Sequence, residues 1–265
     1  MAIYDCFQYF NEDHIVELRL NILDKYVDYF VISESTRNHQ GEKKHKNFDI
    51  NKFKKFKKKI IYLVADPDES LIRKKHKFGH SLIEQHQRNY LIKGLDKADS
   101  DDLILISDSD EIPDLKKLHL IKKKYVAFSQ KAFCYKFNLL NPKEDNWIGT
   151  RACKKKYLQS PHNLRGIKFK KYPFWRIDKR NLQIIDEGGW HFSYLLDMKK
   201  ISEKIKSFSH SEDNIKENTD INNLQKKLMM FIHPTKNYKL NKVPLDKSFP
   251  EYITSNLQKF KNWIA

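Results

Sequence analysis

Three acidic side chains follow one short apolar segment near the middle of the chain. Asp108, Asp110 and Glu111 come directly after residues 102–107, which read Asp-Leu-Ile-Leu-Ile-Ser. Carboxylates this close repel one another, so a strand that delivers them together to its end needs a compensating cation. Because residues two apart in an extended chain point to the same side, Asp108 and Asp110 can reach one ion, or one ion and a ribose. Hard oxygen ligands suit Mg²⁺ or Mn²⁺, and such an ion would bridge to a diphosphate.

Two further roles are open to the same carboxylates. Aspartates at a strand end often cap the next helix, but Asp114, after Pro113, is the better cap here and leaves the three upstream carboxylates without a structural task. The aspartate-nucleophile phosphohydrolases also carry Asp-x-Asp after an apolar strand. Their first Asp normally lies near the start of the chain with Thr or Val four residues later, where this sequence has Ile112. A metal site therefore fits these residues better than either alternative.

The elements around this segment predict a parallel α/β sheet, because strand-like apolar runs alternate with helical spacing over the first half of the chain. Asn11 is the expected N-cap of the first helix, since acidic residues follow it at once. Within that helix, Glu17 and Arg19 are expected to pair with each other. An open sheet of this kind binds its ligand at the carboxyl ends of the strands. The predicted strands are 3–7, 29–33, 60–65 and 102–107, and a second helix is predicted at 82–98.

The second half of the chain has a different pattern of longer mixed stretches. Residues 125–140, 147–158 and 168–177 resemble antiparallel strands joined by loops, and helices are predicted at 198–208 and 250–263. Seven glycines in 265 residues leave no flexible linker, and no internal repeat is present. We therefore expect one domain over residues 1–265, with a nucleotide-binding half at 1–113 and a substrate-binding half at 114–265.

The charge balance is strongly basic, with 51 Lys and Arg against 34 Asp and Glu and a net charge of +17. Only eight of the 51 are Arg, whereas proteins that read phosphates or bases favour the planar Arg side chain. The surplus therefore indicates solubility and attraction to anions, and it does not favour a nucleic-acid partner. Residues 52–59 alternate Phe with Lys, which suits a single nucleic-acid strand, an anionic membrane or an acidic glycan equally.

The three cysteines are an odd, widely spaced set that suits a reducing compartment. The first residues lack the pattern of a signal peptide, and no apolar segment approaches the roughly 20 residues needed to span a bilayer. We expect a cytoplasmic protein, a location compatible with peripheral contact between its lysines and the anionic inner face of a membrane.

Four blocks of sequence, taken in order, resemble glycosyltransferase family 17. They are residues 5–19, residues 27–35, Ile104-Leu-Ile-Ser-Asp-Ser-Asp-Glu-Ile-Pro113 and Gly188-Gly-Trp-His-Phe-Ser193. This family includes the β-1,4-mannosyl-glycoprotein 4-β-N-acetylglucosaminyltransferase that adds bisecting GlcNAc. The resemblance implies a GT-A fold, a UDP-sugar donor, a divalent cation and inversion at the anomeric carbon. The animal enzymes carry an N-terminal membrane anchor with no counterpart in this sequence, so the glycoprotein acceptor does not carry over.

A GT-A fold joins a Rossmann-like nucleotide-binding half-sheet to a mixed or antiparallel extension on the acceptor side. Within it, the resemblance makes Asp110 the first choice as a metal ligand. Asp108 would hold the same ion, a metal-bound water or the ribose. His191 is the candidate third ligand, because its block is similar to the late His-Phe of other GT-A enzymes; the alternative is a core histidine. The nucleotide or donor sugar would contact six further residues, for which capping, surface or solvent roles are the alternatives: Phe7, Asn11, Glu12, Glu34, Ser35 and Arg88.

An inverting transfer also needs a base that takes the proton of the acceptor hydroxyl. Glu111 adjoins the metal pair, and Glu187 could be presented beside His191 by the two glycines that follow it; Asp145 and Asp186 stay open. We therefore predict a metal-dependent inverting glycosyltransferase that moves GlcNAc from UDP-GlcNAc to a glycan acceptor. The alternatives are a basic, non-enzymatic module that binds nucleic acid or polyanions, and a metal-dependent phosphohydrolase.

Overall fold

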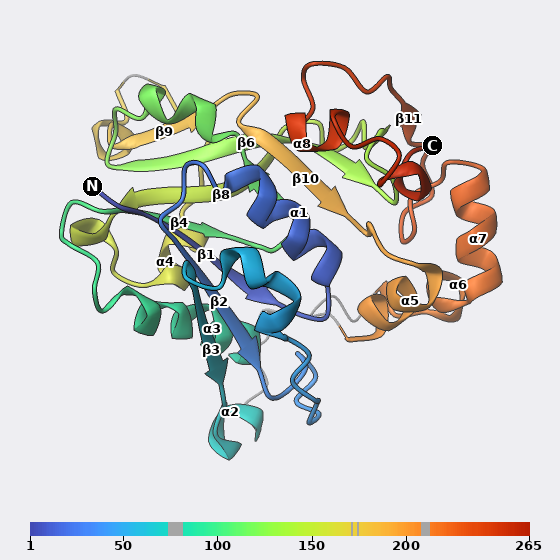
Figure 1. Cartoon of the computed structure of the whole chain (residues 1–265), viewed down its shortest axis with the longest axis horizontal. Coiled ribbons are helices and arrows are strands. Elements are labelled where there is room, and N and C mark those ends of the chain that lie inside the picture. The colour runs from blue at the N-terminus through green and yellow to red at the C-terminus, as the bar shows by residue number, and fades with distance from the viewer. Residues whose placement is uncertain (74–81, 171, 174, 208–212) are drawn as a thin grey trace.

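The computed structural model describes residues 1–73, 82–170, 172–173, 175–207 and 213–265. Its described strands form one mixed sheet in the order β11-β7-β6-β8-β4-β1-β2-β3 (Figure 1). In addition, β9 and β10 pair with β6, and β5 pairs with β10. The chain is therefore α/β, as the sequence predicts.

The first half of the chain forms the parallel part of the sheet. Strands β1 (Ile3–Tyr9), β2 (Tyr29–Ser35), β3 (Ile60–Ala65) and β4 (Leu103–Ser107) all run in one direction in the order β3-β2-β1-β4. The four predicted strands are thus confirmed, with β1 and β2 each extending two residues further. Their carboxyl ends lie along one edge of the sheet.

Alternate side chains of these strands enter two different cores, because successive residues of a strand point to opposite faces. Ile3 and Phe7 of β1 and Leu105 of β4 pack on the face covered by α1 (Asp13–Leu23). Cys6 and Ile104 pack on the other face. There they meet the 3-10 turn Leu91–Leu95, which continues α3 (Leu82–Tyr90), and α4 (Pro161–Gly166). Burial on both faces explains why these strands read as continuous apolar runs.

The second half adds strands of both directions. The long strand β6 (Tyr125–Cys134) pairs antiparallel with β8 (Trp147–Lys154), which in turn pairs antiparallel with β4. Strands β9 (Leu182–Ile185) and β10 (Gly189–Ser193) run parallel to β6, and β5 (Glu111–Pro113) lies antiparallel to β10. Two short strands, β7 (Leu139–Leu140) and β11 (Asn241–Lys242), complete the sheet.

Four sequence predictions about elements need correction. No strand is found in the described part of 168–177, from which residues 171 and 174 are excluded; the next strand is β9. The helix predicted at 250–263 is two short pieces, α8 (Glu251–Thr254) and a 3-10 turn at Lys261–Trp263. The helix predicted at 82–98 ends at Tyr90 and continues as 3-10 structure. Asn11 does not cap α1, because its φ of +65° is left-handed and Glu12 occupies the N-cap position.

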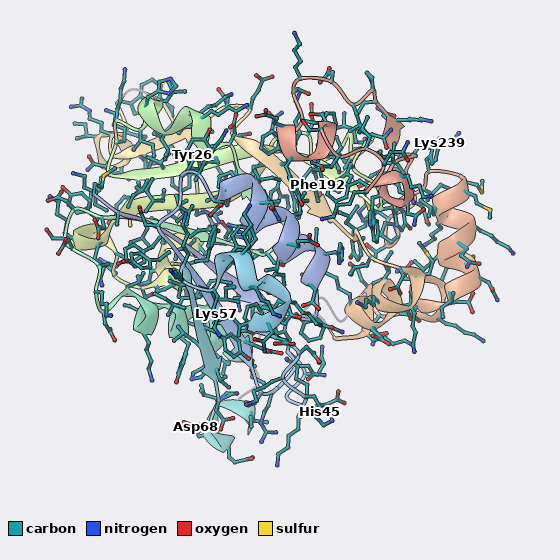
Figure 2. The ribbon with its side chains drawn as sticks, in the orientation of Figure 1. Tyr26, His45, Lys57, Asp68, Phe192 and Lys239 are labelled. Atoms are coloured by element: carbon teal, nitrogen blue, oxygen red, sulfur yellow. The ribbon has the colours of Figure 1, made fainter. Side chains whose placement is uncertain are left out.

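The remaining helices lie at the periphery of the sheet. Figure 1 shows α5 (Met198–Ser207), α6 (Lys216–Thr219) and α7 (Ile221–Met229) grouped at one side, and α2 (Glu69–Arg73) at the tip below β3. Phe208, the predicted end of α5, lies outside the described residues. Figure 2 places Phe192 on β10 in the interior and Asp68 at the tip beside α2. None of the described helices is long and apolar enough to cross a membrane, and the three cysteines are buried free thiols.

Candidate active site

A cavity of about 520 Å³ opens at the carboxyl ends of β1 and β4. The chain passes from β1 to β2 on one side of β1 and returns from β3 to β4 on the other side. This is the point where the strand order reverses, and open α/β sheets bind ligands there. The described lining includes Glu12, Arg88, Asp108, Asp110, His191 and Lys204.

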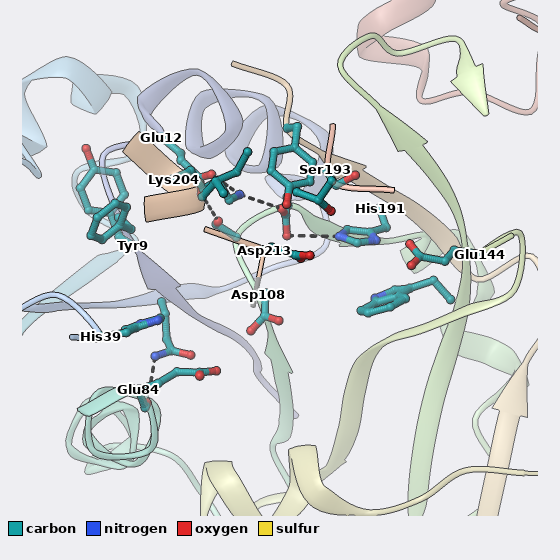
Figure 3. A pocket seen from close by; sticks show the side chains of 18 of the residues that line it. Tyr9, Glu12, His39, Glu84, Asp108, Glu144, His191, Ser193, Lys204 and Asp213 are labelled. Carbon is teal, nitrogen blue, oxygen red and sulfur yellow. Dashed lines mark hydrogen bonds and ion pairs between the residues drawn. The ribbon is translucent and has the colours of Figure 1, made fainter. Parts of the chain in front are cut away.

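The cavity has two sides around the segment that follows β4. Figure 3 shows Tyr9, His39 and Glu84 on one side of Asp108, and His191 and Glu144 on the other. The first side is built by the end of β1 and by α3, both from the first half of the chain. The second side is built by β10 and by the segment between β7 and β8. The two sequence halves thus meet at this cavity.

A buried arginine holds the segment 107–111 in place. The guanidinium of Arg19, which is completely buried on α1, pairs with both carboxylate oxygens of Asp5 at 2.5 and 2.7 Å. It also donates to the backbone carbonyl of Glu111 at 2.5 Å and to the Ser107 hydroxyl at 2.9 Å. The predicted pair of Arg19 with Glu17 is therefore wrong, and Arg19 instead fixes the backbone that carries the acidic side chains.

Asp108 points toward the cavity between two arginines. One carboxylate oxygen lies 3.2 Å from Arg88 of α3, and the other lies 2.8 Å from Arg165 of α4. Burial disfavours the charged form, but Arg165 and then Arg88 outweigh burial and hold the pKa of Asp108 well below its usual range. Asp108 is therefore ionised and firmly oriented.

Glu111 is turned away from the cavity. Its carboxylate is completely buried and accepts hydrogen bonds from the Trp147 indole at 2.8 Å, from the Asp108 backbone N–H at 3.0 Å and from both terminal nitrogens of Arg165 at 2.9 and 3.0 Å. A carboxylate with four donors has no oxygen positioned to take a proton from a substrate. The position of Glu111 therefore does not favour the role of base, and the side chain anchors Arg165 and Trp147 instead.

Asp110 lies in a buried cluster with Glu12 and Lys204. The ammonium of Lys204, on α5, is 2.6 Å from one Glu12 oxygen and 3.3 Å from Asp110 Oδ2. The other Glu12 oxygen accepts the Ser109 hydroxyl at 2.6 Å. Burial raises the pKa of Asp110 despite the nearby Lys204. Burial would also raise the pKa of Glu12, but Lys204 outweighs it and lowers that pKa. The ion pair with Lys204 involves Asp110 Oδ2 and leaves Oδ1 on the side of His191.

His191 faces the second oxygen of Asp110. Its Nε2 lies 3.7 Å from Asp110 Oδ1, which is too long for a hydrogen bond. Strand pairing places the residue there, because His191 of β10 lies opposite Glu111 of β5 and the Phe192 N–H donates to the Asp110 carbonyl at 2.9 Å. The imidazole also stacks on Trp147 with ring centres 4.8 Å apart.

The structure brings together five of the eleven residues proposed from sequence: Glu12, Arg88, Asp108, Asp110 and His191 all line the cavity. Of the candidate bases, Glu187 is 74% exposed in its side chain, and its nearest ion pair is Lys131 at 3.9 Å. Asp145 and Asp186 are exposed as well. None of these three is among the described residues that line the cavity.

The other proposed nucleotide contacts have structural tasks. Phe7 is buried in the core, and the centre of its ring lies 4.8 Å from the guanidinium carbon of Arg19. Glu34 is buried and accepts from Lys44 at 2.6 Å and from Tyr62 at 2.7 Å, among other donors. The Ser35 hydroxyl accepts the Arg37 N–H at 3.1 Å. With Asn11 in a turn before α1, none of the four is among the residues described as lining the cavity.

Sequence reasoning missed three groups that complete the site. Arg165 could have been noticed, because the scarcity of Arg that singles out Arg88 applies equally to it. Lys204 carries no signal in a chain with 43 lysines. Glu144 lies in the segment between β7 and β8 and follows no motif, yet it lines the cavity near His191 (Figure 3).

The cavity is acidic although the chain is basic. Its described lining holds six carboxylates, of Glu12, Glu84, Asp108, Asp110, Glu144 and Asp213, against three permanent cations, Arg88, Lys204 and Lys236. The chain as a whole carries a net charge of +17. Carboxylates therefore outnumber permanent cations in the described lining by three, an imbalance that favours cations in the cavity.

Asp110 and His191 are the described residues that could hold a divalent cation. In the described residues, no group of three or more His, Cys, Asp or Glu side chains converges as a metal site. Asp110 Oδ1 and His191 Nε2 nevertheless face each other at 3.7 Å, and carboxylate oxygen with imidazole nitrogen is a donor set that Mn²⁺ accepts. Ions that also bind substrate phosphates commonly have only one or two protein ligands.

Comparison with known proteins identifies the family. The sequence model of glycosyltransferase family 17 matches residues 1–255. A comparison with curated protein sequences finds no match. Among solved structures, a protein assigned as a glucose-1-phosphate thymidylyltransferase from Bacillus anthracis, in complex with sucrose, has a TM-score of 0.38 and 10% identity over 71% of this chain and 88% of that chain. Because the family match covers nearly the whole sequence, the chain belongs to glycosyltransferase family 17.

Proposed function

We propose that this protein is a divalent-metal-dependent, inverting glycosyltransferase that transfers the sugar of a UDP-sugar donor to a hydroxyl group of a glycan. UDP-GlcNAc is the proposed donor, a choice that rests on the family resemblance alone. The observation that carries the proposal is the acidic cavity of a basic chain, with Asp108 and Asp110 at its centre. A diphosphate enters such a cavity favourably together with a divalent ion.

The ion would be held by Asp110 and His191, and when bound it would neutralise the diphosphate leaving group. Asp108 does not compete for this task, since both of its oxygens are engaged by Arg88 and Arg165. Its place is beside the ion, toward a bound water or the ribose. The aromatic ring of Phe10, with Gln8, lines the cavity at the end of β1 and offers a surface for the base of the nucleotide.

The acceptor would bind on the side of Trp147 and Glu144, which are supplied by the second half of the chain. Glu144 is our choice for the base. The other five carboxylates of the described lining are each in an ion pair with Lys or Arg. In the described part of the chain, Glu144 has no such pair and accepts only the Asn141 amide at 3.1 Å. A carboxylate without a bound cation is a better proton acceptor.

The experiment that tests the function is thermal unfolding against a panel of nucleotide sugars, with and without Mn²⁺. UDP at a hundredfold excess over its Kd stabilises the folded state by about 2.7 kcal/mol, or several degrees in Tm for a chain of this size. We expect this rise with Mn²⁺ present, and we expect Asp110→Asn to abolish it. Asp178→Asn, an exposed carboxylate in an ion pair with Arg176, is the matched control.

Two other outcomes would assign the protein elsewhere. Salt-sensitive binding of heparin or single-stranded DNA that Asp110→Asn leaves intact, with no response to UDP, would favour the polyanion-binding module. Turnover of a simple phosphate ester that neither UDP nor a donor sugar inhibits would favour the phosphohydrolase.

A further inference from the structure

Lys204 is a buried cation that forms an ion pair with Asp110, one of the two proposed metal ligands. It is 9% exposed, and lysine is rarely buried to this extent without a partner. Its ion pairs with Glu12 before α1 and Asp110 after β4 join residues far apart in the sequence. Because it also lines the cavity, its charge acts on whatever enters.

The position of Lys204 is fixed by the packing of its helix. Ile201 and Ile205, on either side of it along α5, are 0% and 3% exposed and belong to a core with Leu224 of α7. The ammonium also lies 5.8 Å from the centre of the Tyr194 ring. Because its neighbours along the helix are buried and its ammonium lies between two carboxylates, Lys204 places a fixed positive charge in the site.

Asp110 divides its two oxygens between two cations. Oδ2 faces the ammonium of Lys204 at 3.3 Å, and Oδ1 faces His191, where the divalent ion is proposed. An ion at Oδ1 would therefore share a single carboxylate with a lysine, and the two positive charges repel across a buried space. A bound diphosphate is negatively charged, so both Lys204 and the divalent ion would attract it.

We propose that Lys204 is a built-in cation of the donor site, which weakens binding of the free metal ion and strengthens binding of the nucleoside diphosphate. This inference rests on the proposed function and adds a residue that selects between the two ligands. It makes the site prefer a diphosphate over a bare divalent ion, so that metal is held firmly only when the donor is present.

The experiment measures two affinities on the full chain: that of Mn²⁺ alone, from the electron paramagnetic resonance signal of the free ion, and that of UDP in the presence of excess Mn²⁺, by calorimetry. For Lys204→Met we expect Mn²⁺ to bind at least about tenfold tighter and UDP at least about fivefold weaker. Lys204→Arg, which keeps the charge, should stay within about threefold of the unmodified protein for both ligands. Lys206→Met, an exposed lysine on the same helix, is the matched control.

In Lys204→Met the affinity for Mn²⁺ is expected to rise while the affinity for UDP falls. This pattern separates an electrostatic role of Lys204 from a structural one, because a damaged site would lose affinity for both ligands. Weaker or unchanged Mn²⁺ binding by Lys204→Met, with thermal unfolding still cooperative, would overturn the inference. If the unmodified protein binds no UDP with or without Mn²⁺, the proposed function itself fails. If it binds UDP with Mn²⁺ and the two affinities of Lys204→Met do not move in opposite directions, only the role of Lys204 fails.

Discussion

Arg19 holds the acidic segment from the centre of the protein. It is completely buried, neutralises Asp5 on β1 and donates to the backbone carbonyl of Glu111 and the hydroxyl of Ser107. Planar guanidinium groups supply several donors in fixed directions, which lysine cannot do. The carboxylates of the candidate site are therefore held by a residue that does not itself line the cavity.

Replacing Arg19 by Met should destabilise the folded state by about 3 to 5 kcal/mol, because Asp5 would remain as a buried charge without a partner. The free energy of unfolding in urea measures this loss. Lys259→Met is the comparison, since Lys259 forms an ion pair with Glu17 of the same helix in which both side chains are 45% exposed. Exposed pairs contribute about 1 kcal/mol or less. A loss below about 1 kcal/mol for Arg19→Met would contradict the role given to Arg19.

Glu144→Gln should lower kcat by about 10²- to 10⁴-fold, because the amide cannot accept the proton of the acceptor hydroxyl. The Kd of UDP with Mn²⁺ should stay within about threefold, since the nucleotide would bind on the other side of the cavity. UDP release from UDP-GlcNAc in the presence of a glycan panel gives the rate, and Glu251→Gln is the exposed control. An unchanged kcat would remove Glu144 from the mechanism.

Among the elements, β10 completes the site from the second half of the chain. It lies between β5 and β6 and carries His191 to Asp110. Its first residue, Gly189, has a φ of +141°, and a Cβ there would lie 2.2 Å from the Ile112 carbonyl oxygen and 2.8 Å from the Asp114 nitrogen. The close pairing of β10 with β5 therefore requires glycine at this position.

Gly189→Ala should cost more than about 2 kcal/mol of stability and weaken the effect of Mn²⁺ on UDP binding, because β10 must shift away from β5. Gly166→Ala is the matched control. That residue ends α4 with an ordinary φ, and a Cβ added there would have no atom within 4 Å, so its stability should change by about 1 kcal/mol or less. Urea unfolding of both variants gives the comparison, and equal losses would refute the argument from pairing.

The turn after α7 contains a histidine that is buried in its neutral form. His233 Nδ1 accepts the backbone N–H groups of Thr235 and Lys236 at 3.3 and 3.2 Å. Burial, helped by the charge of Lys236, lowers the pKa of His233 from 6.5 to about 4. A proton on Nδ1 would break both hydrogen bonds.

Stability should therefore fall as the pH drops below 6.5, since the unfolded chain then takes up a proton that the folded chain takes up only near pH 4. The loss attributable to His233 is about 2 kcal/mol between pH 7 and pH 5. His233→Asn keeps an acceptor oxygen but has no titratable group, so its unfolding free energy should lose that part of the pH dependence. Identical pH profiles for the two proteins would contradict this assignment.

For the molecule as a whole, charge is distributed unevenly. The lysine-rich segment 52–59 has its two phenylalanines, Phe53 and Phe56, 4% exposed in the main core. Buried rings cannot stack on the bases of a nucleic acid, so this segment lacks the aromatic surface that binding of a single nucleic-acid strand would need. Lys52 is paired with Asp13, and Lys59 lies 3.0 Å from Asp24. No lysine of segment 52–59 is among the described residues that line the acidic cavity, so this basic segment and the cavity are separate features of the chain.

The fold of the first half was predictable because its strands are buried on both faces. Continuous apolar runs such as that of β4 (Leu103–Ser107) are typical of strands covered on both faces, and their alternation with helices favours the parallel order. The second half was predicted less well. Strands β7 and β11 have two residues each, and such short elements depend on pairing with distant segments that local periodicity does not report.

The sequence by itself determined that Asp108 and Asp110 stand together at the end of a buried strand, because adjacent residues after a strand cannot be far from its end. It also determined that this end lies at the ligand-binding edge of a parallel sheet. Only the tertiary structure decided which side chains face the carboxylates. Arg88, Arg165, His191 and Lys204 come from α3, α4, β10 and α5, and ion pairs between such distant segments depend on packing rather than on spacing. Packing also decided that Glu111 points away from the cavity, because buried donors such as the Trp147 indole and the Arg165 guanidinium hold its carboxylate. Glu144 lines the cavity instead, which its neighbours in the sequence do not indicate.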